Sequence, residues 1–310
     1  MSKILFSIVI PTYNRADFIV KTIQSILNQT YSNFEIIVVD DGSSDNTAQV
    51  VATYCKNEAR FQYHQRPLNK PKGANACRNY GFELSKGEYV NWFDDDDLMV
   101  DNKIALKVDA ILKNNTDFVI SKTKFFNKKN HSFKNYDFKI EDVSFISFAT
   151  DYIKWLTPDL FVKSNVVEKI KFNEKLKAGQ EHNFNCNLLL HTSKMFFINE
   201  FLTLRRYSEN SIQAIRDQDK THNLRTIFHI HWFNYLSLKD KANNKKFNSY
   251  SLLNCALSYL ELKNLLPMPK HFLREMFRVF HYKGIYFLLA LCSNQIFKRY
   301  YFFYKYLKKE

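Results

Sequence analysis

The sequence predicts an α/β fold in which a mostly parallel sheet is flanked by helices. Over residues 4–125, short runs of β-branched and aromatic residues alternate with stretches of helical spacing, which is the pattern of βαβ units. A chain of 310 residues with 45% hydrophobic composition is also long enough to bury a large core. We therefore expect one full domain followed by a smaller C-terminal region.

Five strands and four helices make up the alternating part of the chain. The expected strands are residues 4–10, 34–40, 61–64, 88–93 and 117–121. The expected helices are residues 16–28, 46–56, 74–85 and 102–113. In the last of these helices Ile104, Val108, Ile111 and Leu112 form one apolar stripe, which is expected to face the core.

The alternation weakens after residue 125. A helix is expected near residues 163–169, another starts near Glu181, and a final strand spans about 195–206. From about residue 216 the spacing is helical, with almost no strand pattern. The predicted domains are therefore residues 1–215, which form the α/β domain, and residues 216–310, which form a helical, basic and aromatic extension.

Cysteine content and hydropathy exclude several classes of protein. The five cysteines are scattered, odd in number and without C-x-x-C spacing, which argues against a disulfide framework or a structural zinc site and favours a reducing cytoplasm. Pro11 ends the first apolar run, so we interpret that run as a buried strand rather than a signal peptide. Neither G-x-G-x-x-G nor G-x-x-x-x-G-K occurs, which disfavours dinucleotide and P-loop enzymes.

Polar residues follow three of the expected strands. They are residues 12–14, residues 40–44 and the four consecutive aspartates Asp94 to Asp97. Because ligands of open α/β sheets bind beyond the carboxyl ends of the strands, these loops are expected to converge on one edge. Crowded carboxylates raise one another's pKa unless a cation neutralises them, so the aspartates predict a divalent metal or a strongly cationic partner.

Four segments together resemble a known enzyme family. They are residues 8–15 (IVIPTYNR), 37–45 (IVVDDGSSD), 74–79 (ANACRN) and 93–97 (FDDDD). In this order and spacing they resemble family 2 glycosyltransferases of the GT-A fold, over residues 4 to about 212. The resemblance implies an inverting enzyme that uses a nucleotide diphosphate sugar, with Mg²⁺ or Mn²⁺ stabilising the leaving diphosphate as a Lewis acid.

The resemblance also implies roles for single residues. Asp96, the last residue of the Asp-x-Asp pattern, is the expected metal ligand, supported by Asp94 and Asp95. Glu181, which follows a Gly-Gln step at a helix start, is the expected base that takes the proton from the acceptor hydroxyl. The expected donor-binding residues are Pro11, Thr12, Tyr13, Asn14, Asp41, Arg78, Asp94 and Asp95.

Ordinary structural roles stay open for two of these positions, Asp41 and Glu181. Thr12 and Asp41 match positions that contact the nucleotide base in relatives, and a carboxylate suits the imide N–H of uracil because it only accepts hydrogen bonds. Asp41 could also cap the turn before Gly42, and Asp40 could shape that loop or reach the ribose. Glu181 could be an ordinary first-turn glutamate.

One position departs from the family pattern. Many relatives carry Arg-x-His near the end of the catalytic domain, and that histidine can complete the metal site. Here Ser208 stands in its place, and a hydroxyl is a poorer ligand than an imidazole. Three explanations are open: water fills the position, the loop differs, or the metal is held more weakly.

The C-terminal region carries most of the net charge of +14. Residues 241–310 hold 13 Lys or Arg against three Glu, together with 16 Phe or Tyr. Aromatic rings favour the membrane interface and cations favour anionic headgroups, so this region could lie on the inner face of the cell membrane. The alternative is helical packing with a solvated basic face. No nucleic-acid module is recognised, and binding of nucleic acid ranks last.

The resulting hypothesis is a metal-assisted inverting glycosyltransferase acting on a glycan or lipid-linked acceptor, with UDP as the expected nucleotide. Bacterial surface polysaccharide synthesis is the expected setting by family analogy. Two alternatives stay open. One is a metal-dependent nucleotidyltransferase, although the loop after the first strand holds no glycine. The other is a non-catalytic, membrane-associated scaffold that binds a nucleotide.

Overall fold

The computed structural model describes residues 4–128, 137–209, 218–262 and 266–308. The chain divides into two compact units, Met1–Tyr207 and Ser208–Glu310. The boundary predicted at residue 215 lies outside the described residues.

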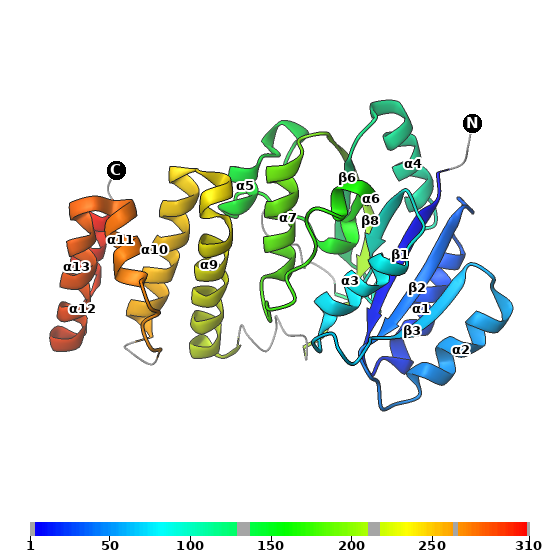
Figure 1. The fold of residues 1–310 in the computed structure, drawn as a ribbon, viewed down its shortest axis with the longest axis horizontal. Coiled ribbons are helices and arrows are strands. Elements are labelled where there is room, and N and C mark those ends of the chain that lie inside the picture. Colours follow the sequence, from blue (N-terminus) through cyan, green and yellow to red (C-terminus); the bar gives the residue numbers. More distant parts are fainter. Residues whose placement is uncertain (1–3, 129–136, 210–217, 263–265, 309–310) are drawn as a thin grey trace. The chain divides into compact units, whose positions relative to one another are not determined.

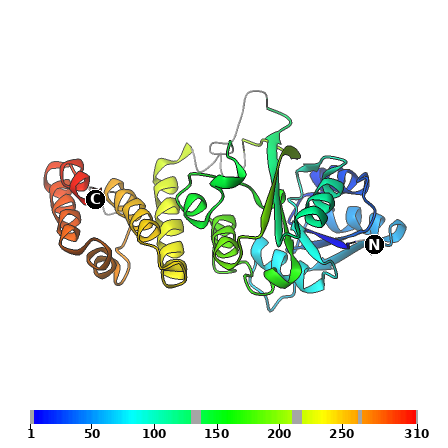
Figure 2. The ribbon, with the colours of Figure 1, turned by 90° about the horizontal axis from the view of Figure 1, so that it is seen from above.

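The N-terminal unit contains an eight-stranded sheet with the order β3-β2-β1-β4-β7-β6-β8-β5 (Figure 1). Its bounds are β1 Phe6–Thr12, β2 Phe34–Asp40, β3 Phe61–Gln65, β4 Tyr89–Trp92, β5 Leu98–Met99, β6 Phe118–Phe125, β7 Leu160–Lys163 and β8 Met195–Arg205. The first four strands run parallel to one another. The strand β7 runs antiparallel between β4 and β6, while β6 and β8 run parallel and side by side (Figure 2). The predicted α/β fold is confirmed, and β5 and β7 are two strands that the sequence pattern missed.

The four predicted helices of this unit form within two residues of their expected bounds. They are α1 Ala16–Leu27, α2 Thr47–Asn57, α3 Ala74–Leu84 and α4 Lys103–Asn114. Gly81 lets α3 approach β1 closely, since a Cβ at this position would lie 2.3 Å from Val9 Cγ1. The predicted stripe of α4 is wrong at Leu112, which is 57% exposed, whereas Lys103 and Lys107 of this helix are fully buried. The buried residues of α4 thus form one face that includes these two lysines and leaves out Leu112.

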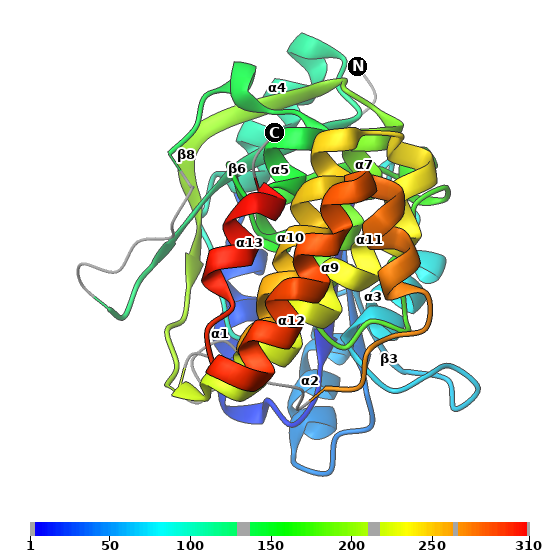
Figure 3. The ribbon, with the colours of Figure 1, turned by 90° about the vertical axis from the view of Figure 1, so that its left-hand side faces the viewer.

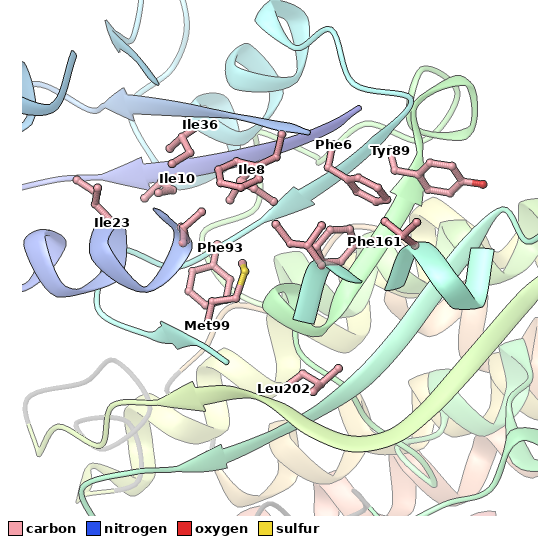
Figure 4. Close-up of a cluster of buried hydrophobic side chains, with 14 of the residues drawn as sticks. Phe6, Ile8, Ile10, Ile23, Ile36, Tyr89, Phe93, Met99, Phe161 and Leu202 are labelled. Carbon is pink, nitrogen blue, oxygen red and sulfur yellow. The ribbon is translucent and has the colours of Figure 1, made fainter. Parts of the chain in front are cut away.

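The core of the N-terminal unit lies between the sheet and these helices (Figure 4). Side chains from all eight strands and from α1, α2 and α4 pack in it. The members labelled in the figure are Phe6, Ile8, Ile10, Ile23, Ile36, Tyr89, Phe93, Met99, Phe161 and Leu202. All seven residues of β1 and of β2 are buried, as expected for central parallel strands covered on both faces. This rigid centre fixes the loops at the carboxyl ends of β1, β2 and β4.

Shorter elements complete the N-terminal unit. They are the 3₁₀ turns Ile140–Asp142 and Thr157–Asp159 and the helices α5 Phe145–Ala149, α6 Ser164–Val167 and α7 Gln180–His191. The helix expected near residues 163–169 is found as the four-residue α6. The helix expected near Glu181 is found as α7, which begins one residue earlier.

The C-terminal unit is helical throughout its described residues, as predicted (Figure 3). Its helices are α9 Lys220–Ala242, α10 Lys245–Glu261, α11 Phe272–Phe280, α12 Ile285–Phe297 and α13 Tyr301–Lys308, with a 3₁₀ turn at His281–Gly284. Phe228, Cys255 and Phe272 are among the residues of its own hydrophobic core. Within the described part of the chain, no helix combines the length and apolar character needed to span a bilayer.

Candidate active site

Three of the predicted site segments meet at the carboxyl edge of the parallel strands. The backbone N–H of Asp41 donates to the carbonyl oxygen of Thr12 at 2.9 Å, which joins the end of β1 to the end of β2. The N–H of Phe93 donates to the carbonyl oxygen of Val9, also at 2.9 Å, so the aspartates emerge beside β1. The sheet therefore brings Thr12, Asp41 and Asp94 to one edge.

Asn14 connects two of the loops at this edge. Its backbone adopts a left-handed conformation, with φ of 53°, which asparagine tolerates better than most residues. Its N–H donates to Ser43 Oγ, and its Oδ1 accepts from the N–H of Ser44, both at 2.8 Å. Among the predicted donor-binding residues, Asn14 thus holds the loop after β1 against the loop after β2.

The neighbouring aspartates after β2 make different contacts. Asp40 Oδ1 accepts from the N–H groups of Gly42 at 3.0 Å and Ser43 at 2.7 Å, and Tyr63 donates to its Oδ2 at 2.8 Å. Asp40 therefore holds the turn. Asp41 instead forms an ion pair with Arg66, and both side chains are largely buried. The carboxylate of Asp41 is thus positioned by a cation rather than used as a turn cap.

The side chains of the four consecutive aspartates point to different surroundings. Arg78, a buried arginine of α3, donates through Nη2 to Asp94 Oδ1 at 3.1 Å. Asp94 and Asp96 keep 28% and 24% of their side-chain surface exposed, whereas Asp95 and Asp97 are buried. Only the first and third aspartates therefore offer carboxylate oxygens at the rim.

Two arginines lie against this cluster. Arg15 Nε lies 3.6 Å from Asp95 Oδ1, and its Nη2 lies 3.8 Å from Asp96 Oδ2. Arg206 donates its N–H to Asp97 Oδ1 at 3.0 Å and its Nε to the carbonyl oxygen of Asp96 at 3.2 Å. The end of β8 is thereby fixed to the aspartate loop.

The pKa values show that these arginines do not neutralise the cluster. Burial raises the pKa of Asp95 to about 7, against the opposing effects of the Thr12 hydroxyl and of Arg15. Burial and the neighbouring Asp94 raise the pKa of Asp96, although Arg15 and two later arginines act in the opposite direction. The pKa of Asp97 is raised well above its usual value by burial and by the two exposed aspartates. Burial and like charges therefore disfavour the ionised carboxylates of this loop by more than the arginines favour them.

The exposed pair of carboxylates fits a divalent cation. Asp94 and Asp96 offer oxygen ligands, which Mg²⁺ and Mn²⁺ prefer. A cation would offset the repulsion that, after burial, helps to raise the pKa of Asp95 and Asp97. In the described ranges no group of three or more His, Cys, Asp or Glu side chains is placed to hold a metal. Mg²⁺ is commonly held by one or two carboxylates together with substrate phosphates, so two rim carboxylates suit a metal that binds with a diphosphate.

Two buried lysines lie behind the aspartate loop. Lys103 donates to the carbonyl oxygen of Pro158 and to Thr203 Oγ1, both at 2.7 Å. Lys107 donates to the carbonyl oxygens of Val119 at 3.0 Å and Asp159 at 2.7 Å. Burial lowers the pKa of Lys103 to about 7 although Asp159 and Asp97 act in the opposite direction. These lysines fix the segment around Pro158 to the sheet.

Glu181 lies in the first turn of α7 and is held by the same segment. Its Oε1 accepts from the backbone N–H of Thr157 at 3.3 Å. The next residue, Pro158, accepts at its carbonyl oxygen from Lys103 and from Asn91 Nδ2, the latter at 3.1 Å. Glu181 is thereby connected through this short segment to β4, the strand that ends at the aspartates.

Sequence reasoning predicted Arg78 but missed three other arginines of the site. Arg15, Arg66 and Arg206 each contact at least one of the aspartates, but no role was predicted for them. Arg15 directly follows the predicted donor-binding residues 11–14 and could have been found by its place in that motif. The pairing of Arg66 with Asp41 spans 25 positions and that of Arg206 with Asp97 spans 109, so neither follows from local pattern.

Comparison with protein families and individual relatives gives a consistent result. The family model described as "Glycosyl transferase family 2" matches residues 7–174. Glycosyltransferase GlyG of Streptococcus pneumoniae serotype 4 is 28% identical over 93% of this chain and 95% of its own length. An uncharacterized glycosyltransferase of Rickettsia bellii is 38% identical over 38% of this chain, and the matched part is 16% of that protein. Escherichia coli WfgD, described as a UDP-Glc:alpha-D-GlcNAc-diphosphoundecaprenol beta-1,3-glucosyltransferase, is 33% identical over 41% of this chain and 49% of its own length.

Solved structures share the fold. Residues 1–349 of S. aureus TarS in complex with UDP-GlcNAc match with a TM-score of 0.67 and 17% identity, over 97% of this chain and 90% of that one. The mannosyltransferase PcManGT of Pyrobaculum calidifontis, in complex with GDP-Man and Mn²⁺, matches with a TM-score of 0.54 and 15% identity, over 97% and 84% of the two chains. Such identities show the fold alone, and it is the GT-A fold expected from the sequence.

Proposed function

Because the chain belongs to glycosyl transferase family 2, we propose that it transfers a sugar, with inversion, from a nucleotide diphosphate sugar to a glycan or lipid-linked acceptor. The observation that carries this proposal is the pair of exposed carboxylates, Asp94 and Asp96, beside aspartates whose pKa is raised. A loop with these carboxylates is suited to a cation that binds together with the diphosphate.

Asp96 and Asp94 are the proposed metal ligands. When bound, Mg²⁺ or Mn²⁺ would supply Lewis-acid stabilisation of the departing diphosphate. Arg78 holds Asp94 in place through its hydrogen bond. Arg15, which is 42% exposed and lies within 4 Å of two aspartates, could also face a phosphate, since arginine binds phosphate oxygens through several N–H groups.

Donor recognition is proposed for the edge formed by β1 and β2. Asp41 would accept from the imide N–H of uracil, with Arg66 fixing its orientation. Pro11 and Thr12 are buried at the end of β1, while Tyr13 is exposed and Lys72 Nζ lies 4.3 Å from the centre of its ring. The TarS complex with UDP-GlcNAc supports a uridine donor, and the PcManGT complex supports a divalent metal.

Glu181 is the proposed general base. It would take the proton of the acceptor hydroxyl as that oxygen attacks the anomeric carbon. Its Oε1 accepts a hydrogen bond from the N–H of Thr157, and the residue lies in the first turn of α7, so the carboxylate is held in a defined position.

The proposed location is the cytoplasmic face of the bacterial cell membrane, during synthesis of surface polysaccharide. The end of the chain supports contact with an anionic bilayer. In α12, α13 and the residues between them, exposed apolar and aromatic side chains accompany cations. The exposed side chains are Ile285, Leu289, Ile296, Phe297, Tyr301 and Phe302, and Lys298 and Arg299 lie between the two helices. Rings at the interface and cations at the headgroups stabilise such contact. The description of WfgD supports a lipid-linked acceptor.

Calorimetry with matched variants tests the proposal. UDP-sugars titrated into the protein should bind more tightly with Mn²⁺ than with EDTA, and Asp96→Asn should reduce the Mn²⁺-dependent affinity at least about tenfold. The control is Asp109→Asn, which changes an exposed aspartate of α4 and should leave binding unchanged. If no UDP-, GDP- or dTDP-sugar binds more tightly with metal, or if the two variants behave alike, the proposed donor site is wrong.

A further inference from the structure

The C-terminal unit contains a cavity of about 430 Å³ that is separate from the residues of the proposed donor site. It lies where α9 ends, α10 begins and α11 ends. The cavity is lined by Lys239, Asp240, Asn243, Lys245, Asn248, Arg278, Val279 and His281. All of these residues except Val279 are polar, and the volume lies in the range of small-molecule sites.

Two of the lining cations are held by one buried carboxylate. Glu275 Oε2 accepts from Lys239 Nζ at 3.1 Å, and Arg278 Nε lies 3.0 Å from the same oxygen. Tyr235 also donates to this oxygen at 2.5 Å, and Arg278 Nη2 donates to the tyrosine hydroxyl at 3.1 Å. One carboxylate therefore fixes two cations at the cavity wall.

The cavity wall keeps an excess of positive charge. Lys245 adds a third cation to the lining, and Asp240 is its acidic member. The Glu275 side chain is only 3% exposed, so it orients the cations from behind without occupying the cavity. Lys245 also begins α10, a helix of 17 residues, and helix N-termini favour anions.

An unpaired acceptor completes the lining. Asn248 Oδ1 is buried and makes no hydrogen bond to any residue of the described part of the chain. A buried acceptor without a donor is unfavourable unless a water molecule or a ligand supplies one. The cavity therefore offers cations to an anionic group and an oxygen to a hydroxyl group.

We propose that this cavity binds the phosphate group of a phosphorylated polyhydroxy compound. Arg278, Lys239 and Lys245 would contact the phosphate oxygens, and Asn248 would accept from a hydroxyl. This site goes beyond the proposed transfer reaction and does not depend on it. The same chemistry occurs in a free polyol phosphate and in a glycerophosphate lipid headgroup, and the experiment below separates these two sources.

The test uses the full chain and two adjacent lysines of α10. Glycerol 3-phosphate is titrated calorimetrically in EDTA, which removes divalent metal from the donor site, and binding to vesicles with and without phosphatidylglycerol is measured in parallel. Lys245→Gln should weaken the interaction about tenfold, because one charge-assisted contact is lost. Lys246→Gln is the matched control, since Lys246 is an exposed neighbour outside the lining.

Three outcomes decide the proposal. Glycerol 3-phosphate binding that Lys245→Gln weakens and Lys246→Gln preserves supports the site with a soluble ligand. The same contrast seen only with phosphatidylglycerol vesicles supports it with a lipid headgroup. If neither probe binds, or if both variants reduce binding equally, the cavity is not a phosphate site. Metal-dependent binding of UDP-sugars should be unchanged in both variants, so failure here is distinguishable from failure of the proposed donor site.

Discussion

The aspartate loop of the N-terminal unit and Glu275 of the C-terminal unit show opposite pKa shifts. In the N-terminal unit, burial and like charges raise the pKa of Asp95, Asp96 and Asp97 despite the arginines nearby. In the C-terminal unit, burial also acts to raise the pKa of Glu275, but hydrogen bonds from Tyr235 and Lys239 outweigh it and the pKa is lowered. Nearby cations and hydrogen-bond donors therefore offset the effect of burial only in part at the aspartates, which are undercompensated. At Glu275 they more than offset it, so this carboxylate is overcompensated.

The difference indicates which kind of ligand each region suits. A carboxylate with a raised pKa lacks stabilising positive charge, so added cations bind there favourably. A carboxylate with a lowered pKa already has cations around it, and at Glu275 the two cations share one oxygen. The two directions of pKa shift thus accord with the proposed cation site in the first unit and the proposed phosphate site in the second.

The largest expected effect is the loss of sugar transfer when the proposed base, Glu181, is replaced in the N-terminal unit. Glu181→Gln keeps the size and shape of the side chain but removes its capacity to accept a proton, so the transfer rate should fall roughly 10²- to 10⁴-fold. Sugar transfer to an added acceptor is measured by release of the nucleotide diphosphate. Glycerol 3-phosphate binding in the C-terminal unit should not change.

The control for this change is Glu168→Gln. Glu168 follows α6 and is exposed, so its substitution should leave the transfer rate as it is. Wild-type activity in Glu181→Gln would reject Glu181 as the base and leave it as a first-turn glutamate that fixes Thr157.

Most strands and helices could be predicted because their patterns are local. β2 forms at residues 34–40 as expected, since a run of β-branched and aromatic residues between polar turns has few other interpretations. The four-residue β7 could not be predicted, because it is stabilised by antiparallel pairing with β4 and β6, which are distant in sequence. Lys103 was equally hidden, because a lysine in an amphipathic helix usually faces solvent.

The sequence predicts which loops meet at the site, but it does not predict which side chains contact one another there. The order of the polar loops along a parallel sheet places Thr12, Asp41 and Asp94 together, and the structure does so. Which aspartate holds the turn after β2 depends on side-chain direction, and a sequence pattern does not give this direction. The cavity beside Lys245 was also not predicted, since it forms where the ends of three helices meet.

The buried lysines of the N-terminal unit give the next largest effect. The pKa of Lys103 is about 7 in the folded chain against 10.5 when unfolded, so between these pH values the unfolded chain binds more protons. The Lys103 contribution to the free energy of unfolding should therefore rise with pH in this window. Because one pKa unit corresponds to about 1.4 kcal/mol, the rise amounts to several kcal/mol.

Urea unfolding of wild type and Lys103→Met between pH 7 and pH 9 measures this slope. The variant should show a smaller increase in unfolding free energy than wild type. Part of the increase should remain, because burial lowers the pKa of Lys107 as well. Equal slopes in the two proteins would mean that Lys103 stays charged in the folded chain. The N-terminal unit would then stabilise this buried charge, as the C-terminal unit stabilises the charge of Glu275.

The smallest expected effect concerns the stability that the Glu275 carboxylate contributes in the C-terminal unit. Its folded pKa lies below the unfolded value of 4.5, so its stabilising contribution is fully present above about pH 4.5 and is lost as the pH falls through the folded pKa. Glu275→Gln should lower the free energy of unfolding by roughly 1.5–3 kcal/mol at pH 7, the usual range for hydrogen bonds to a charged group. The variant should also lose less stability than wild type between pH 6 and pH 3.

Glu209→Gln, at an exposed position of the same unit, should follow the wild-type pH profile in urea unfolding. If acidification instead stabilised wild type relative to Glu275→Gln, Glu275 would be undercompensated like Asp95, and the contrast between the two units would not hold.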